Sequence, residues 1–433
     1  MRTKKIALLL LIQSAIIGTA VASEQSESKG FVEDADGSIL FRTGFIHRDK
    51  KSGPKDQSSY AQTAIVNLDS GYTKGIVGFG VGAVGDFSVG LGENNNSNNN
   101  MVPRNNQGEP YDHWTRGGGN VKARFSNTTV RYGTQVLDLP VLASNTARLV
   151  PEYFTGTLIN SREIDNVELI AGKFTKNQFS DQISTDENEL DRATVWGVKY
   201  QLNDQTKLAY YGVDNKDRLE RHYANANYTY PVAKGTWTFD FSGYHTDWDQ
   251  EANGNLYSYS GNPDDEYQNS IWGVSTTYNT GPHNIMLAYQ QNIGNVGYDY
   301  NLGKGVADGG QSIYVPNSYL SDFIGNDEKS VHLQYNYNFA NFGLKGLNWT
   351  NAAVYGWDID VADGADRTQL VSDNSEEYEF FSQVKYTVQS GFAKDASLRV
   401  RHSYYRADDE YDATYIGDTN EWRLFLDIPV NLF

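Results

Sequence analysis

A strict two-residue alternation of apolar and polar side chains is the strongest constraint on this chain. Near the C-terminus the apolar residues occupy the even-numbered positions, and Glu421, Arg423, Asp427 and Asn431 lie between them. The apolar set is Trp422, Leu424, Leu426, Ile428, Val430 and Leu432. Only an extended strand puts every second side chain on one face. The segment therefore predicts a strand with lipid or a core on one side.

The alternation recurs along the chain and predicts an all-β fold. It is present at 38–48, 77–83, 237–242, 379–388 and 397–405. Short turns at 72–75, 202–205 and 389–395 separate some of these runs, and long polar stretches separate others, at 93–111, 247–268, 301–328 and 358–377. Short turns at one end and long loops at the other are typical of transmembrane antiparallel β-barrels.

The length of the chain suggests the size of such a barrel. At about 23 residues for each strand with its connection, residues 23–433 predict a single barrel domain of about 18 strands, although 16 fits the same arithmetic. Barrels of this size enclose an aqueous channel. The Asn-rich run at 94–100 is interpreted as a solvated loop tip, because its composition is that of a polar tract.

The first 22 residues have the order of a secretory signal peptide. Arg2, Lys4 and Lys5 precede an apolar run at 6–17, and Ala20-Val21-Ala22 follows it. The apolar run is too short for a membrane anchor, which needs about 20 residues. We therefore expect cleavage after Ala22 and export to the outer membrane of a Gram-negative cell.

Composition excludes several classes of function. The net charge of the whole chain is -18, and removing residues 1–22, which carry three basic and no acidic residues, makes it -21. Such an acidic protein is a poor nucleic-acid binder, because phosphate contacts need an excess of Lys and Arg. The chain has no cysteine, so thiolate chemistry and disulfides are absent. Its 30 Tyr, 19 Phe and 8 Trp fit a barrel with aromatic girdles.

Cations recur on the polar face of several predicted strands. In a closed barrel the first strand pairs with the last, which brings the cations of both chain ends to one inner wall. The inward set is Arg42, Arg48, Lys122, Arg124, Arg131, Lys385, Arg399, Arg401 and Arg423. Like charges side by side cost energy unless an anion uses them, so the strip predicts a low-affinity path for anionic groups. The alternative is that these residues are ordinary solvated lumen side chains.

Short motifs spread over nearly the whole chain resemble the OprD-type substrate-specific porins of Gram-negative bacteria. Each is weak alone, but their order is specific. They include Gly30-Phe31-Val32-Glu33-Asp34, Ser126-Asn127-Thr128-Thr129, Arg148-Leu149-Val150-Pro151, Gly172-Lys173-Phe174, Asn317-Ser318, Ser321-Asp322-Phe323, Glu328-Lys329-Ser330, Arg399-Val400-Arg401 and Asn420-Glu421-Trp422-Arg423-Leu424.

The resemblance implies an 18-stranded barrel with short periplasmic turns and extracellular loops that fold into the pore. It also implies a ladder of basic side chains that includes Arg42, Arg131, Lys385, Arg399 and Arg401. The third loop, at 138–154, would bring Asp138 and Arg148 to the constriction. The seventh loop, at 301–326, would place Ser318 and Asp322 opposite the ladder. This chain departs from the pattern at Val315-Pro316, in a shorter stretch from Ser318 to Asp322 and in a shorter segment after Phe174.

The function that the resemblance implies is facilitated diffusion of small anionic or zwitterionic solutes that bear a carboxylate. Basic amino acids, small peptides and aromatic acids are the expected classes, with carbapenem antibiotics as a further class. A general, unselective diffusion porin is the main alternative. The expected partners are outer-membrane lipid, lipopolysaccharide and the barrel-assembly machinery, and the expected state is a monomer or a homotrimer.

Other functions have weaker support in the sequence. A hydrolase barrel needs a His near a Ser or Asp nucleophile, but His47, His222, His245, His332 and His402 show no recurrent spacing with either, so we expect no enzymatic activity. His402 shares a face with Leu398 and Val400, which favours a membrane-interface position. The Asp residues at 358, 360, 363 and 366 suggest a calcium loop but lack its full spacing, so no metal and no cofactor are expected.

Overall fold

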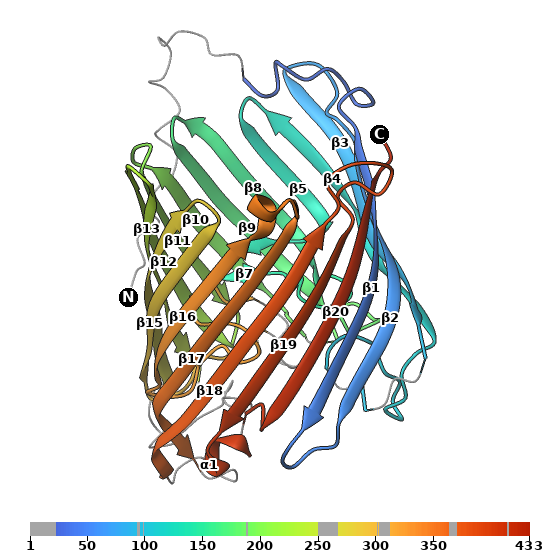
Figure 1. Ribbon diagram of the computed structural model, residues 1–433. Coiled ribbons are helices and arrows are strands. Elements are labelled where there is room, and N and C mark those ends of the chain that lie inside the picture. Colours follow the sequence, from blue (N-terminus) through green and yellow to red (C-terminus); the bar gives the residue numbers. More distant parts are fainter. Residues whose placement is uncertain are drawn as a thin grey trace, which may run out of the picture.

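The chain folds into one closed antiparallel β-barrel. The computed structural model describes residues 23–433 except 93–95, 98, 188, 250–266, 301, 303–311, 363–369 and 414. The predicted signal peptide at 1–22 lies outside the described residues. Within the described part, eighteen strands form a single sheet, and β1 pairs with both β2 and β20, which closes it (Figure 1). The predicted fold class is confirmed.

The barrel strands follow one another around the wall in chain order. They are β1 (Asp36–Lys50), β2 (Gln57–Asp69), β3 (Val77–Gly90), β4 (His113–Phe125), β5 (Thr128–Gln135), β8 (Tyr153–Ile164), β9 (Val167–Gln178), β10 (Ala193–Gln201), β11 (Thr206–Asn215), β12 (Leu219–Val232), β13 (Gly235–Trp248), β14 (Tyr267–Thr280), β15 (His283–Gly294), β16 (Lys329–Asn338), β17 (Leu347–Ala362), β18 (Leu370–Thr387), β19 (Ser397–Ala407) and β20 (Thr419–Asn431). The smaller elements are β6 (Asp138–Leu139) and β7 (Leu142–Ala143), which pair with each other, the 3-10 helix η2 (Phe339–Phe342) and α1 (Asp409–Asp412).

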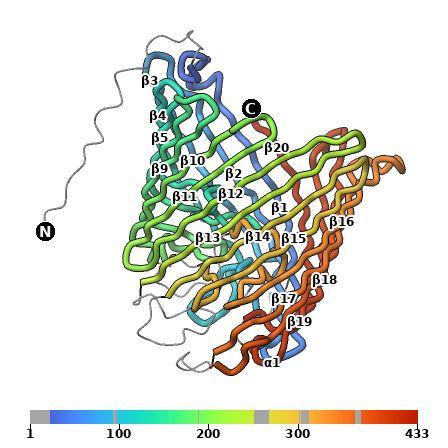
Figure 2. The backbone as a smooth tube through the Cα atoms, turned by 90° about the vertical axis from the view of Figure 1, so that its left-hand side faces the viewer, coloured from blue at the N-terminus to red at the C-terminus, as the bar shows by residue number. Residues whose placement is uncertain are grey.

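The two ends of the barrel differ in the length of their connections. Turns as short as Asp165-Asn166 and Gly281-Pro282 join strand pairs at one end, which faces the periplasm in barrels of this type. Longer connections, such as 136–152 and 295–328, leave the other end. Figure 2 shows the strands running obliquely to the barrel axis, as closure of a sheet requires. No helix in the described part is long and apolar enough to cross a membrane.

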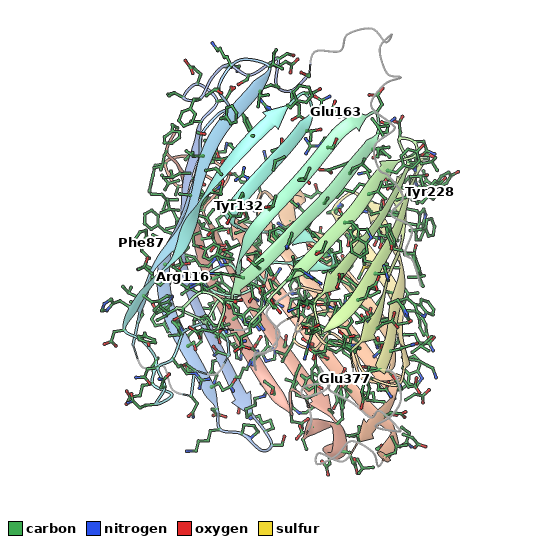
Figure 3. All side chains as sticks on the ribbon, turned by 180° about the vertical axis from the view of Figure 1, so that it is seen from behind. Phe87, Arg116, Tyr132, Glu163, Tyr228 and Glu377 are labelled. Atoms are coloured by element: carbon green, nitrogen blue, oxygen red, sulfur yellow. The ribbon has the colours of Figure 1, made fainter. Side chains whose placement is uncertain are left out.

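Large apolar side chains cover the outside of the wall. On β13, Trp237, Phe239 and Phe241 point outward and are 36%, 46% and 40% exposed, whereas Ser242 and Tyr244 point inward and are buried. Phe87 and Tyr228 likewise project from the outer surface (Figure 3). A continuous apolar exterior of this extent is stable only against hydrocarbon.

Outward aromatic rings gather near both ends of the wall. Near the turns, the rings of Trp237 and Tyr278 stack with 4.6 Å between centroids. Near the loops, His402 lies 4.4 Å from Trp422, in agreement with the interface position predicted for this histidine. Amphipathic rings favour the boundary between hydrocarbon and headgroups, so the two groups mark the borders of the membrane.

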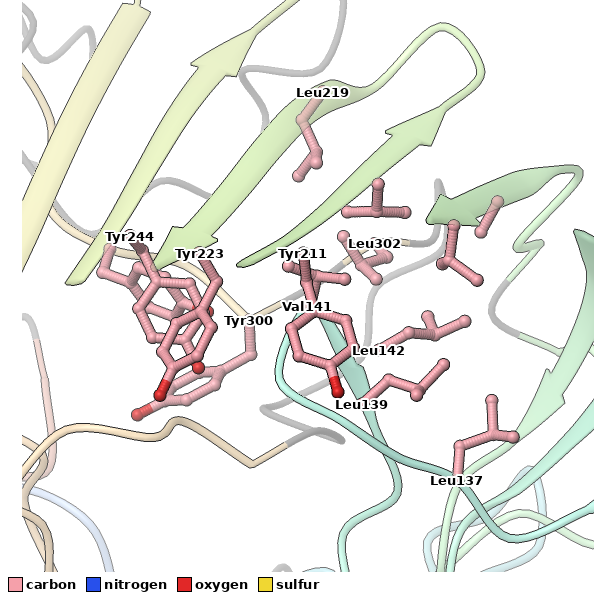
Figure 4. Packing of buried hydrophobic residues seen from close by; sticks show 14 of the residues in the cluster. Leu137, Leu139, Val141, Leu142, Tyr211, Leu219, Tyr223, Tyr244, Tyr300 and Leu302 are labelled. Atoms are coloured by element: carbon pink, nitrogen blue, oxygen red, sulfur yellow. The ribbon is translucent and has the colours of Figure 1, made fainter. Parts of the chain in front are cut away.

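The apolar core lies inside the barrel, where loops fold against the wall. Leu139 and Leu142 of the third loop pack with Tyr298 and Leu302 of the seventh loop and with inward residues of β9 to β14, such as Tyr211 (Figure 4). Burial of this cluster fixes both loops within the lumen. The space that remains therefore lies toward the opposite wall, formed by β18, β19, β20 and β1.

One sequence-based interpretation of a polar stretch was wrong, and another was wrong for part of its range. The predicted loop at 358–377 is mostly strand, because β17 continues to Ala362 and β18 begins at Leu370; strands that extend into water carry polar residues on both faces and lose the alternation. The predicted solvated tip at 94–100 is wrong for its last two residues: Asn99 and Asn100 are 0% and 9% exposed and accept hydrogen bonds from Ser59 (2.8 Å) and Ser180 (2.7 Å). Asn96 is exposed, and residues 94, 95 and 98 lie outside the described residues. Polar residues are buried when such partners satisfy them.

The two faces of β13 should respond differently to the same charge. We expect Phe241→Lys to lower the free energy of unfolding from lipid vesicles by about 2–4 kcal/mol, because it puts an ammonium group against hydrocarbon near the middle of the strand. Thr238→Lys, on the inward face, should have a much smaller effect. Equilibrium unfolding in guanidinium measures both, and equal losses would contradict this assignment of the faces.

Candidate functional site

Strand register brings six of the predicted cations together on one part of the inner wall. Lys385 on β18 is opposite Arg399 on β19, and Arg401 is opposite Arg423 on β20. Arg42 and Arg48 on β1 are opposite Asp427 and Glu421 on β20. We call these residues the main basic cluster, namely Arg42, Arg48, Lys385, Arg399, Arg401 and Arg423. The closure of β1 on β20 unites residues from the two ends of the chain.

A second basic cluster, Lys122, Arg124 and Arg131, lies nearer the turns on β4 and β5. Lys122 Nζ and Arg131 Nη2 donate to the same oxygen, Asp69 Oδ2, at 2.6 and 3.1 Å. Arg124 Nε donates to the side-chain oxygen of Gln25 at 3.1 Å. The two clusters lie on neighbouring strands from β18 through β1 to β5, so all nine predicted cations share one arc of the wall.

Glycines on β3 make room for the second cluster. Gly80 is opposite Lys122 in the β3–β4 register. A Cβ at position 80 would lie 2.6 Å from Cε of Lys122 and 2.7 Å from the carbonyl oxygen of Gly71. Since carbon atoms do not approach so closely, the lysine stem can lie flat against β3 only because residue 80 has no side chain.

The inner wall also carries carboxylates, and these pair with some of the cations. Arg42 makes a two-point contact with Asp427, with N···O distances of 2.7 and 3.1 Å. Glu421 Oε2 accepts from Arg48 Nε at 2.8 Å and from Arg423 Nη2 at 3.1 Å. Charge-assisted bonds of this kind hold each guanidinium group in a fixed direction. Half of the main basic cluster is therefore already matched by carboxylates.

Three cations are left without an ion pair in the part of the chain that the structure describes. They are Lys385, Arg399 and Arg401. The Nε atoms of both arginines are buried and have no hydrogen-bond partner in the protein. The positive charges of all three residues are therefore not compensated by a carboxylate at close range, which makes them the part of the wall best able to attract an anion.

A cavity of about 540 Å³ lies between the main basic cluster and the inward loops. Arg48, Arg401 and Arg423 line one side of it, and Arg148 of the third loop lies on the cavity as well. Ser318 and Asp322 of the seventh loop face the same space. The structure thus brings cations and the two predicted seventh-loop residues to one narrow passage.

Asp322 is held by two hydroxyl groups on the loop side of this passage. Ser318 Oγ donates to Oδ1, and the hydroxyl of Tyr300 donates to Oδ2. Burial raises the pKa of the Asp322 carboxyl, while both hydrogen bonds and the positive charges of Arg148 and Arg423 act in the opposite direction. A carboxyl group opposite several guanidinium groups produces an electric field across the passage.

Asp138 does not lie with these residues. Its carboxylate accepts a hydrogen bond from the hydroxyl of Tyr314, which ties the third loop to the seventh. The third loop occupies 136–152, so Tyr153 and Phe154, which the sequence analysis assigned to it, belong to β8. Asp138 therefore supports the loops and does not line the passage.

Two glutamates of β18 anchor the seventh loop, and the sequence analysis missed both. Glu379 accepts hydrogen bonds from the backbone N–H groups of Leu320 and Ser321, each at 3.0 Å to Oε2. Glu377 accepts from the hydroxyl of Ser321 at 3.0 Å. Both positions share the odd parity of Lys385, which is the signal that could have placed them on the inner face. They hold the segment between Ser318 and Asp322 against the inner wall at β18.

Comparison with known proteins agrees with this architecture. The family described as outer membrane porin, OprD family, matches residues 29–432. Porin D of Pseudomonas aeruginosa is 33% identical over 435 residues, which covers 96% of this chain and 95% of that protein. The chain belongs to the OprD family of outer-membrane porins.

Solved structures of OprD-family porins have the same barrel. The crystal structure of OccAB1 from Acinetobacter baumannii is 63% identical, with a TM-score of 0.90 over 95% of this chain and 100% of that chain. The structure of OprD from Pseudomonas aeruginosa is 30% identical, with a TM-score of 0.78 over 96% and 100%. The protein is therefore a substrate-specific type of porin in the outer membrane, and porins of this family are transporters without enzymatic activity.

One contact on the outside of this OprD-family barrel resembles a hydrolase triad. His245 Nδ1 lies 2.8 Å from Ser270 Oγ, and His245 Nε2 lies 3.5 Å from Asp247. Because His245 and Ser270 are paired in the β13–β14 ladder, their backbone N–H groups take part in the sheet and offer no oxyanion hole. The predicted absence of a hydrolase site agrees with the family assignment.

The structure describes two of the four aspartates considered for calcium binding. Asp358 forms an ion pair with Lys329 at 2.6 Å, and Asp360 lies near the end of β17. Asp363 and Asp366 lie outside the described residues. Among the described side chains, no group of three or more His, Asp or Glu has the geometry to hold a metal ion.

The third loop is anchored by buried polar groups that the sequence analysis did not single out. Arg116 is matched by Asp86 and donates to the carbonyl oxygen of Pro151 at 2.7 Å. Glu152 is fully buried and accepts from the backbone N–H of Asn145 and from Asn177 Nδ2 at 3.2 and 3.1 Å. These contacts fix both ends of the segment that carries Arg148.

The carboxyl group of Glu152 should make the stability of the protein depend on pH. Burial raises its pKa from 4.5 to about 8. The folded protein keeps a proton that the unfolded chain releases between these values, so the stability present below 4.5 falls as the pH rises toward 8. We expect Glu152→Gln, which cannot ionise, to flatten this decline in thermal midpoint. Glu27→Gln, at an exposed position, should follow the wild type; an unchanged slope in Glu152→Gln would contradict the assignment.

Proposed function

We propose that this porin mediates facilitated diffusion of small carboxylate-bearing solutes. The observation that carries the proposal is the set of cations without an ion pair among the described residues: Arg401 lines the passage that Asp322 faces, and Arg399 and Lys385 follow it on the same wall toward the turns. Guanidinium groups bind carboxylates through a planar fork of donors. Basic amino acids, small peptides and aromatic acids carry the required group, as do carbapenem antibiotics.

The proposed path has several weak sites in place of one strong one. A solute carboxylate would pass from Arg401 to Arg399 and Lys385, and then toward Arg131 in the second cluster. Carboxylates of the protein already bind Arg42, Arg48 and Arg423, which weakens the attraction of the wall. Rapid transport requires that binding be favourable enough for entry and weak enough for exit.

The field across the passage would orient a solute that carries both charges. Its carboxylate would face Arg401 and Arg423, and its ammonium or guanidinium group would face Asp322. Such an arrangement favours zwitterions and basic amino acids over simple anions of the same size. Ser318 supports this geometry by donating to Asp322.

Export and assembly belong to the same proposal. Cleavage after Ala22 would leave a barrel domain at 23–433, whose first residues already contact the turn end: Glu24 pairs with Arg162 at 2.9 Å. The barrel-assembly machinery would insert it, and the outward apolar surface would contact lipid and lipopolysaccharide. The proposed oligomeric state is a monomer or a homotrimer.

Removal of Arg401 should lower selectivity more than general permeability. We expect Arg401→Ala to reduce glutamate and benzoate uptake relative to a neutral sugar by about twofold to tenfold, the range that corresponds to one hydrogen bond. A liposome-swelling panel with arginine, glutamate, benzoate and the sugar measures it. The matched control is Arg406→Ala, because Arg406 lies on the same strand but pairs with Asp418 outside the pore. Equal slowing of all four solutes by Arg401→Ala would instead favour an unselective porin.

Loss of the Asp322 charge should alter selectivity in another way. We expect Asp322→Asn to reduce arginine uptake by about twofold to tenfold relative to benzoate, because the solute cation loses its opposite charge. Asn retains the size of the side chain and can accept from Ser318. Single-channel conductance in salt should change little. Unchanged arginine-to-benzoate ratios would show that the passage does not orient solutes.

A further inference from the structure

Two phenyl rings interrupt the polar inner face beneath the unpaired arginines. Phe381 on β18 and Phe425 on β20 point into the barrel, in rows whose other members are mostly polar or charged. They are only 3% and 1% exposed. Neither ring belongs to the large cluster that fixes the third and seventh loops to β9–β14, although Phe425 packs in a smaller cluster with Leu149 and Val150 of the third loop.

Each ring lies against a cation of the main basic cluster. The guanidinium carbon of Arg401 is 4.9 Å from the centroid of Phe381. The guanidinium carbon of Arg399 is 5.1 Å from the centroid of Phe425, and that of Arg42 is 5.4 Å from the same ring. All three distances lie within the range of a cation–π interaction.

The contrast between Arg42 and its two neighbours suggests a role for the rings. Arg42 has both a ring and a carboxylate: its Nε and Nη2 donate to Asp427, and its Nη1 donates to the carbonyl oxygen of Arg148. Arg399 and Arg401 have a ring and no ion pair among the described residues. A ring face attracts the positive charge through its quadrupole but accepts none of the strong hydrogen bonds that a carboxylate would. The rings can therefore stabilise the cations while leaving N–H donors for a solute.

The surrounding backbone is shaped to hold both rings. Gly44 on β1 is opposite Phe425, and a Cβ at position 44 would lie 2.9 Å from the ring. Phe381 stacks on Tyr319 of the seventh loop, with 4.2 Å between centroids and 24° between planes. The ring under Arg401 is thus fixed between the wall and the loop that carries Asp322.

We propose that Phe381 and Phe425 are positioning residues that set the selectivity for carboxylates. They hold Arg401 and Arg399 against the wall in place of acidic partners, so that the guanidinium groups keep donors directed to the solute. This inference rests on the proposed function and deepens it. On this proposal, the preference for carboxylates depends on the contact of each cation with a ring as well as on the number of cations.

The test is a double-mutant cycle on the full-length porin in liposomes. Phe381→Leu removes the ring face and keeps an apolar side chain of similar size. We expect it to lower the ratio of benzoate to sugar uptake by about threefold to tenfold, and to have little effect when Arg401 is already Ala, because the ring then has no cation to position. The matched control is Phe380→Leu, the neighbouring residue on the lipid face, which should leave the ratio unchanged.

Other outcomes would overturn the inference. If Phe381→Leu leaves the ratio unchanged, or lowers it by the same factor with Arg401 present or absent, the ring acts only by filling space. If Arg401→Ala itself leaves the ratio unchanged, the proposed function fails first. Phe425→Leu with Arg399→Ala forms an independent second cycle with the same expected pattern. Heat-modifiable migration on gels confirms that each variant has folded.

Discussion

The need to satisfy every backbone N–H and C=O group inside a membrane governs this structure. Hydrocarbon offers no hydrogen bonds, so a sheet can span it only if no edge is left open. The pairing of β1 with β20 meets this condition. It also fixes the direction of every side chain, because neighbouring residues on a strand face different solvents. The apolar exterior and the polar lumen both follow from closure.

Inside the barrel, charge is balanced locally. A wall of unmatched cations would repel itself, and a fully paired wall would attract no solute. The observed wall lies between these limits. Glu421 pairs with two arginines and Asp427 with one, whereas Arg399 and Arg401 lie against aromatic rings. The loops complete the passage from the other side, anchored by carboxylates such as Glu379.

The features that follow from residues close together in the sequence, such as the face of a strand on which a side chain lies, could be predicted. Two-residue alternation fixed the face of Arg401 and Trp422 without knowledge of any partner, and closure placed Arg42 near Arg423. The contacts across the lumen depend on residues far apart in the chain, so alternation alone could not reveal that Glu379 holds Leu320 or that Asp138 binds Tyr314. The same limitation hid the role of Phe425, whose parity was clear but whose neighbouring cations come from other strands.

The close fit between Gly44 and Phe425 ties the two extremities of the chain together. Since a methyl group at position 44 would collide with the ring, a larger residue there is tolerated only alongside a smaller one at position 425. A smaller residue at position 425 with Gly44 unchanged would leave a void beneath Arg42 and Arg399. Substitutions at these positions are therefore coupled across the seam. A lineage that altered the bulk of one would have to alter the other in step, and its solute preference would shift with the pair.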